Sequence, residues 1–168
     1  MLKLSGKTLE DGEFRGTAKV FDSEAAALAA IRDGGIVAGD VVVVRYVGPV
    51  GAPGMPEMVH LTIQLQGRGL GKEVALITDG RFSGVSHGIL VGHICPEAAK
   101  GGPLGAVRDG DTIVINPITR RLDIDIPAEE LEARVAQMRI PALSDVPEGS
   151  VLGKYRRLVS SAHYGCVL

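Results

Sequence analysis

The apolar positions of this chain fall in short continuous runs that predict buried β-strands. Residues 41–47, 74–77 and 89–94 are rich in Val, Ile and Leu, and glycine, proline or polar residues lie at or near the ends of each run. Continuous rather than alternating apolar runs are typical of strands that are covered on both faces. We therefore expect three central strands in these segments.

Helical signals recur between and after these runs. The clearest is at 22–31, where Asp22 or Ser23 is a candidate N-cap and good helix formers follow. Cys95-Pro96-Glu97 indicates another helix start, because Pro is favoured at the first helical position. Further helices are expected at 57–66, 127–135 and 151–162.

A β-hairpin is predicted near the C-terminal third, with strands at 112–116 and 121–126 around a Pro-containing turn. The whole pattern gives many short strands and a few helices, in no regular alternation of strand and helix. We therefore expect one domain over 1–168, with 139–168 as linker and terminal helix. Its fold should be a mixed or antiparallel β-barrel or sandwich with helices packed outside.

Composition excludes several classes of protein. A hydrophobic content of 45% is too high for a disordered chain, and the net charge of −2 gives no basic surface for nucleic acid. The chain has no apolar run near the ~20 residues of a membrane span, and its first residues lack a signal-peptide core. Two cysteines cannot form a disulfide framework, so a cytoplasmic location is expected.

The first segment with candidate chemistry is GPVGAPGMPEM at 48–58, which holds three Gly and three Pro. Pro fixes φ and Gly permits positive φ, so this composition predicts a rigid loop of special shape. Pro56 would stand near the first position of the following helix and Glu57 in its first turn. There Glu57 either stabilises the helix end or is aimed at a divalent cation such as Mg²⁺.

The second such segment is TDGRFSG at 78–84, which follows a predicted buried strand. Polar groups gathered where a buried strand ends are typical of a reaction site, although a structural turn is the alternative. Asp79 and Ser83 with His87 or His93 could also form a Ser-His-Asp set, but Ser83 lacks the glycine two residues before it that a nucleophile elbow requires. The four histidines and two cysteines show no zinc spacing.

Four motifs together resemble one family. The segments at 48–58, 76–84, 92–98 (GHICPEA) and 108–111 (RDGD) are similar, in this order, to the C-terminal domain of the dihydroxy-acid dehydratase family. That family includes 6-phosphogluconate dehydratase and sugar-acid dehydratases, and the wording GAPGMPE resembles the dihydroxy-acid branch more closely. The resemblance implies a mixed β/α fold: a β-barrel-like swivelling domain with flanking helices.

The resemblance also implies a reaction, the dehydration of a 2,3-dihydroxy acid to a 2-keto acid. An iron–sulfur cluster and Mg²⁺ are the cofactors of the complete enzymes. By position, Ser83 matches the general base and Glu57 matches a carboxylate that helps to bind Mg²⁺. We further expect Arg81, Thr78 and Asp79 to contact the substrate.

By this resemblance, the chain corresponds to only part of a complete enzyme. In the complete enzymes a longer N-terminal region carries the cluster cysteines and most Mg²⁺ ligands, and Cys95 and Cys166 cannot hold a cluster. We therefore expect this chain alone to bind neither cofactor, to be inactive, and to pair with an N-terminal domain in cis or in trans. Its uncovered face could also associate with a second copy of the chain as a homo-oligomer. Branched-chain amino-acid biosynthesis is the expected role. A sugar-acid dehydratase domain, or a binding module that kept the fold without the chemistry, are the alternatives.

Overall fold

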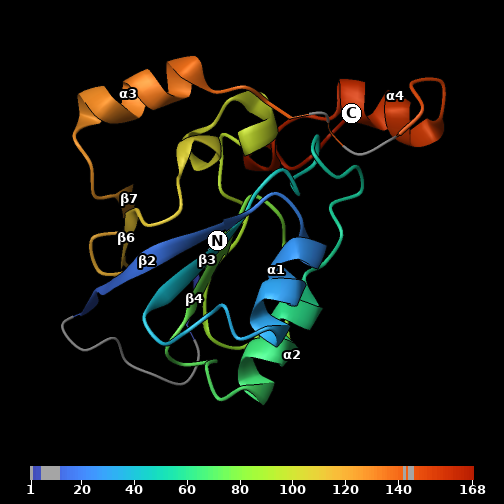
Figure 1. Ribbon diagram of the computed structural model, residues 1–168. Helices are drawn as coiled ribbons and strands as arrows, with labels where there is room; N and C mark the ends of the chain where they lie inside the picture. The colour runs from blue at the N-terminus through green and yellow to red at the C-terminus, as the bar shows by residue number, and fades with distance from the viewer. Residues whose placement is uncertain (1, 5–11, 142, 144–145) are drawn as a thin grey trace.

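The computed structural model describes residues 2–4, 12–141, 143 and 146–168. Its seven strands form one sheet in the order β1-β5-β4-β3-β2-β6-β7, which curls into a half-barrel with four flanking helices (Figure 1). This confirms the predicted mixed β/α fold with helices outside. The strands are β1 (Leu2–Leu4), β2 (Phe14–Phe21), β3 (Asp40–Val44), β4 (Ala75–Thr78), β5 (Ile89–Val91), β6 (Thr112–Asn116) and β7 (Arg121–Ile124). The helices are α1 (Glu24–Arg32), α2 (Val59–Gly67), α3 (Ala128–Gln137) and α4 (Val151–Leu158), with short 3₁₀ turns η2 (Ala98–Lys100), η3 (Pro103–Ala106) and η4 (Ala162–Tyr164).

The centre of the sheet is parallel. β2 pairs with β3, β3 with β4 and β4 with β5 in parallel register, whereas β1, β6 and β7 pair antiparallel at the two edges. The helices α1 and α2 connect the parallel strands, so the stretch from β2 to β4 alternates regularly between strand and helix. The expectation of no regular alternation was therefore wrong for this part, because parallel strands need helical crossovers.

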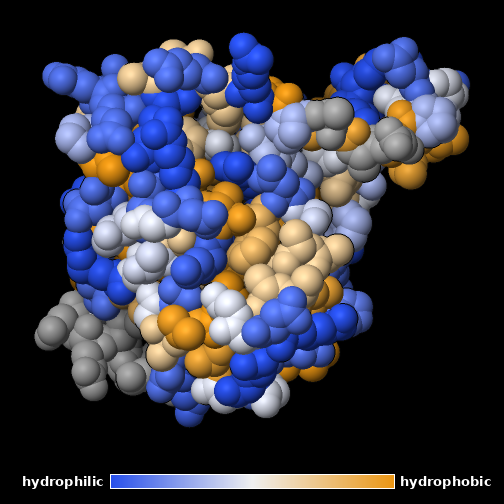
Figure 2. Space-filling view, in the orientation of Figure 1, coloured by the Kyte–Doolittle hydropathy of each residue, from blue (hydrophilic) through white to orange (hydrophobic). Residues whose placement is uncertain are grey.

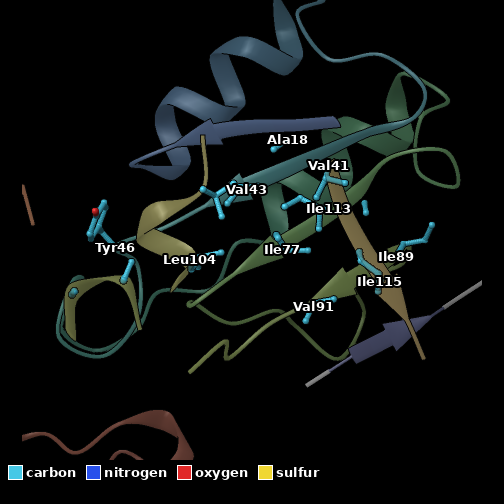
Figure 3. Close-up of a cluster of buried hydrophobic side chains, with 14 residues drawn as sticks. Ala18, Val41, Val43, Tyr46, Ile77, Ile89, Val91, Leu104, Ile113 and Ile115 are labelled. Carbon is cyan, nitrogen blue, oxygen red and sulfur yellow. The ribbon is translucent and has the colours of Figure 1, made fainter. Parts of the chain in front are cut away.

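The three central strands are covered on both faces, as their continuous apolar runs predicted. In β3, Val41 and Val43 point to one core, while Val42 and Val44 point to the other, since side chains alternate along a strand. The first core lies on the inner face of the half-barrel and is shown in Figure 3. The second core lies between the sheet and the two helices α1 and α2, which lie side by side in Figure 1.

The elements begin and end close to their predicted positions, with two exceptions that matter for the site. Helix α2 begins at Val59, so Glu57 lies before the helix and not in its first turn. The expected position of Glu57 in the first turn of the helix was therefore wrong. The segment 95–97 does not begin a helix either, because only the short turn η2 follows it, and the Cys95–Pro96 peptide is cis.

Helices α3 and α4 lie away from α1 and α2 and are weakly buried. The helix α3 has no buried residue, and α4 buries only Gly153. Figure 2 shows the α4 region as a lobe that projects from the body and carries both polar and apolar residues. Val151 and Leu158 are 82% and 68% exposed there. No helix in the described part of the chain is both long and apolar enough to cross a membrane.

Candidate functional site

Three loops that carry the sequence motifs meet at one edge of the sheet. Because β3, β4 and β5 are parallel, their carboxyl ends lie at the same edge. The segment 45–58 leaves β3 there, 79–88 leaves β4, and 92–97 leaves β5. Crevices outside the carboxyl ends of parallel strands are where open α/β sheets bind ligands. The topology therefore brings together motifs that lie up to 50 residues apart in the chain.

Glu57 and Arg81 are direct neighbours across two of these loops. Their backbones form an isolated parallel β-bridge, in which the N–H of Met58 donates to the Arg81 carbonyl at 3.2 Å. The Arg81 Nε also donates to the carbonyl of Met55 at 2.6 Å. These contacts hold the Gly/Pro-rich loop against the loop that carries Ser83, two residues beyond Arg81. Glu57 and Ser83 thus lie on adjacent segments.

Asp79 connects all three loops through its carboxylate. The carboxylate accepts the backbone N–H of Tyr46 at 3.1 Å, of Val47 at 3.0 Å and of Ala98 at 3.1 Å. The side chain is fully buried, and burial raises the pKa of Asp79 while the three N–H groups oppose that shift. Among the described residues its partners are backbone groups and not a histidine, which gives a Ser-His-Asp set no support.

Thr78 and Ser83 use their hydroxyl groups to shape the loop between them. The Thr78 Oγ1 accepts the N–H of Gly80 at 2.9 Å, and its side chain is fully buried. The Ser83 Oγ accepts the N–H of Val85 at 3.2 Å and is only partly buried. Of the predicted substrate contacts, Arg81 is exposed whereas Thr78 and Asp79 are not. Their contact with a substrate stays a prediction.

His93 lies on the other side of the Ser83 loop from Glu57. Its N–H donates to the carbonyl of Gly80 at 2.8 Å, which continues the pairing of β4 with β5 beyond the strand ends. Burial, together with the positive charge of Arg81, lowers the pKa of the His93 imidazole. The electric field of Arg81 thus reaches across this edge of the sheet.

Glu97 is a residue of the site that the sequence pattern did not single out. It is fully buried, and one of its carboxylate oxygens, Oε1, accepts the N–H of Ala162 at 2.9 Å. The other oxygen, Oε2, is buried without a hydrogen-bond partner in the described residues. A carboxylate next to Pro96 and within an otherwise apolar segment was the signal available in the sequence.

The structure also contains a cavity of about 1060 Å³ that does not include Glu57, Arg81 or Ser83. It runs along the inner face of the half-barrel toward β7, and His93 and Cys95 lie at its border. The candidate site is instead an open edge formed by the three loops.

The described residues contain no group of three or more His, Cys, Asp or Glu side chains that could hold a metal ion. Glu57 therefore offers a single carboxylate. It is partly exposed, and its side chain has no ion pair or hydrogen bond with the described residues. One such carboxylate fits Mg²⁺ as part of a shared set of ligands, since Mg²⁺ keeps several waters and uses one or two carboxylates. Two cysteines do not fit an iron–sulfur cluster.

Comparison with known proteins gives consistent matches. Residues 1–166 match the family model described as dihydroxy-acid/6-phosphogluconate dehydratase C-terminal. A dihydroxy-acid dehydratase of Methylococcus capsulatus is 57% identical over 165 residues, which cover 98% of this chain and 29% of that protein. The mitochondrial dihydroxy-acid dehydratase pbrD of Penicillium brasilianum is 50% identical, and the match covers 98% of this chain and 27% of that protein. A dihydroxy-acid dehydratase of Aeropyrum pernix is 52% identical, and the match covers 92% of this chain and 28% of that protein. The chain thus spans less than a third of the length of these relatives.

Proposed function

Because this chain belongs to the dihydroxy-acid/6-phosphogluconate dehydratase family as its C-terminal domain, we propose that it forms one half of a dehydratase active site. The reaction is the conversion of a 2,3-dihydroxy carboxylic acid to a 2-keto acid. The observation that supports the proposal is the backbone bridge between Glu57 and Arg81, which joins the segment of Glu57 to the loop of Ser83. The relatives are named dihydroxy-acid dehydratases, which favours a dihydroxy acid over a sugar acid as substrate. We propose that this dihydroxy acid belongs to branched-chain amino-acid biosynthesis.

Ser83 is proposed to take the proton from C2 of the substrate as an alkoxide. An ordinary serine hydroxyl is a very weak base, so it needs positive charge nearby to lower its pKa. Arg81 supplies one such charge from two residues away. Once C2 has lost its proton and C3 its hydroxyl, the resulting enol tautomerises to the 2-keto acid.

Arg81 is proposed to orient the substrate carboxylate. Its Nε is committed to the Met55 carbonyl, which fixes the plane of the guanidinium group. The other guanidinium nitrogens have no hydrogen bond within the described part of the chain, and the side chain is exposed. A planar guanidinium with free N–H groups is suited to bind a carboxylate through two parallel hydrogen bonds.

Glu57 is proposed as one Mg²⁺ ligand, with the remaining ligands on the N-terminal part of the enzyme. A bound Mg²⁺ would supply positive charge that stabilises negative charge on the substrate and on Ser83. No step is assigned to an iron–sulfur cluster in this chain, because its residues do not fit one. The proposal therefore includes an N-terminal dehydratase domain as partner and no activity for this chain alone. A cytoplasmic location is also part of the proposal.

The test is reconstitution with an N-terminal dehydratase half that carries its cluster and Mg²⁺. We expect formation of 2-keto acid only from the mixture, and loss of roughly 100- to 10,000-fold in kcat for Ser83→Ala. Thr17→Ala is the matched control, because Thr17 is an exposed hydroxyl residue at the amino end of the parallel strands, opposite the site. Its activity should equal that of the wild type.

Two results would contradict the proposal. Equal activity of Ser83→Ala and wild type would remove Ser83 from the chemistry. Absence of any association between the two halves, measured by gel filtration, would favour a binding module that retains only the fold. Activity on a sugar acid but not on a branched dihydroxy acid would keep the reaction and change the substrate.

A further inference from the structure

Hydrogen bonds fix the C-terminal segment, residues 151–168, on the loops of the candidate site and on the turn η2. The Arg156 Nε donates to the carbonyl of Val50 at 3.0 Å, which joins α4 to the Gly/Pro-rich loop after β3. The Lys100 Nζ donates to the carbonyl of Val159 at 3.2 Å, and the N–H of Ala162 donates to Glu97 Oε1 at 2.9 Å. The last residues of the chain therefore lie against the loop that follows β5.

The end of this segment folds back on itself. After the turn η4, Gly165 is left-handed, and the N–H of Cys166 donates to the carbonyl of Ser161 at 3.3 Å. The N–H of Ser160 also donates to the carbonyl of Val167 at 2.9 Å. This closed turn brings Cys166 back beside Ala162, the residue that is hydrogen-bonded to Glu97.

Cys95 lies on the opposite side of the same contact, two residues before Glu97. Its thiol donates to the carbonyl of His93 at 3.2 Å, and both cysteines are partly buried. The hydrogen bond from the Ala162 N–H to Glu97 joins the two segments that carry these cysteines. Burial, followed by the charges of the Glu97 carboxylate and Cys95, raises the pKa of the Cys166 thiol. Cys95 and Cys166 are also the only two cysteines of the chain.

We propose that Cys95 and Cys166 form a thiol pair that a low-molecular-weight disulfide oxidises to an intramolecular disulfide, which fastens the C-terminal segment to the loop after β5. One cysteine thiolate attacks the small disulfide, giving a mixed disulfide and releasing one thiol. The second cysteine thiolate then attacks the protein sulfur of that mixed disulfide and releases the second thiol. The two cysteines lose two electrons and two protons in total, and the small disulfide is reduced to two thiols.

The chemistry has a defined dependence on pH. The thiolate is the attacking species, and the raised pKa of Cys166 keeps more of that thiol protonated at neutral pH. We therefore expect the rate of closure to increase as the pH rises from 7 toward the ordinary thiol range of about 8–9.

The experiment is peptide mapping of the chain after treatment with glutathione disulfide, alkylation of the remaining thiols and trypsin digestion without reductant. Trypsin places Cys95 in the peptide 82–100 and Cys166 in the peptide 158–168. We expect these two peptides to be linked, with a mass two hydrogen atoms below their sum, in protein that migrates as a monomer. The Cys95→Ser and Cys166→Ser variants should give no link and should carry glutathione on the remaining cysteine.

Separate glutathione adducts on both peptides of the wild type would overturn the proposal, as would two unreacted thiols or a link found only in dimers. Because the measurement is made on the wild type, it does not depend on whether a variant folds. A further comparison sets Glu97→Gln, which keeps an acceptor for the Ala162 N–H, against Glu97→Ala, which does not. Closure should be slower in Glu97→Ala than in Glu97→Gln. None of these readouts requires dehydratase activity, so the proposed function and the thiol pair can fail separately.

Discussion

At the scale of single residues, the carboxylates of the site differ in burial and in hydrogen bonding. Asp79 holds three backbone N–H groups from two other loops, whereas Glu57 leaves its carboxylate without a partner in the described residues. A buried carboxylate with several N–H donors is a structural connection, since leaving those donors unpaired costs free energy. A partly exposed carboxylate without partners remains available for a ligand. The two acidic residues thus have different roles although both stand in loop motifs.

Replacement of Asp79 by Asn should destabilise the fold. An amide has one acceptor oxygen and would direct an NH₂ group at a backbone N–H, so at least one donor loses its partner. We expect the free energy of unfolding to fall by roughly 2–4 kcal/mol, measured by urea denaturation. Asp33→Asn is the control, because Asp33 is an exposed residue at the end of α1 and should have little effect. Equal stability of the two variants would argue against the connecting role.

The titration of His93 reports on the electrostatics of the same edge. Its pKa should lie below 6.5 in the wild type, because burial and Arg81 both disfavour the charged imidazole. The stability that His93 contributes is therefore present above that pH and is lost as the pH falls through the lowered pKa. In Arg81→Met the pKa should rise toward its ordinary value, as followed by NMR titration of the imidazole protons. In the control variant Arg68→Met, which changes an exposed arginine after α2, the pKa of His93 should stay as in the wild type.

At the scale of elements, the loop between β3 and α2 is rigid because backbone approaches backbone. An added Cβ at Gly51 would lie 2.2 Å from the carbonyl oxygen of Tyr46, a distance that non-bonded atoms do not reach. The Tyr46 N–H is in turn held by Asp79, so a shift at Gly51 is transmitted to the centre of the site. The loop shape, and with it the position of Glu57, depends on this close contact.

Gly51→Ala should therefore lower both stability and activity. We expect a loss of at least about 1–3 kcal/mol in the free energy of unfolding, because the new methyl group forces the loop to move. Gly67→Ala is the matched substitution in α2, where an added Cβ has no neighbour within 4 Å. It should be neutral or stabilising by up to about 1 kcal/mol, since Ala favours the helix. Similar effects of the two substitutions in thermal unfolding would contradict this account.

At the scale of the whole molecule, the sheet with α1 and α2 forms the buried body, while α3 and α4 are attached by a few polar contacts. The helix α3 has no buried apolar residue and is joined to the body by Arg134, whose guanidinium pairs with Asp111 at 2.7 Å. Asp111 also accepts the N–H of Arg108 at 2.8 Å, which fixes it in its own turn. A helix with so little apolar burial depends on such contacts for its position.

Arg134→Met should release α3 without unfolding the sheet. Amide hydrogen exchange within α3 (Ala128–Gln137) should become faster, while the amides of β3 and β4 keep their protection. Arg139→Met, which changes an exposed arginine just after the helix, serves as the control and should leave exchange unchanged. Loss of protection in β3 as well would mean that α3 is part of the cooperative core.

The sequence by itself determined the elements and the motifs. The continuous apolar runs identified β3, β4 and β5, because a strand covered on both faces must be apolar throughout. Of the two candidate caps of α1, Asp22 and Ser23, the structure uses Ser23, whose Oγ accepts the N–H of Ala26. These features follow from interactions between neighbours in the chain, which local patterns report. The loop motifs likewise carried the family resemblance that the comparisons confirm.

The tertiary structure alone decided how these loops meet. Asp79 joins residues 33, 32 and 19 positions away, and Glu97 joins Ala162 at a distance of 65 positions. Glu57 pairs with Arg81 as extended backbone, although the local pattern of Pro and Glu favoured a helix start. Parallel strands bring their carboxyl ends together whatever the length of chain between them. The neighbours of a loop residue are therefore set by strand order, a property of the whole sheet that no local pattern encodes.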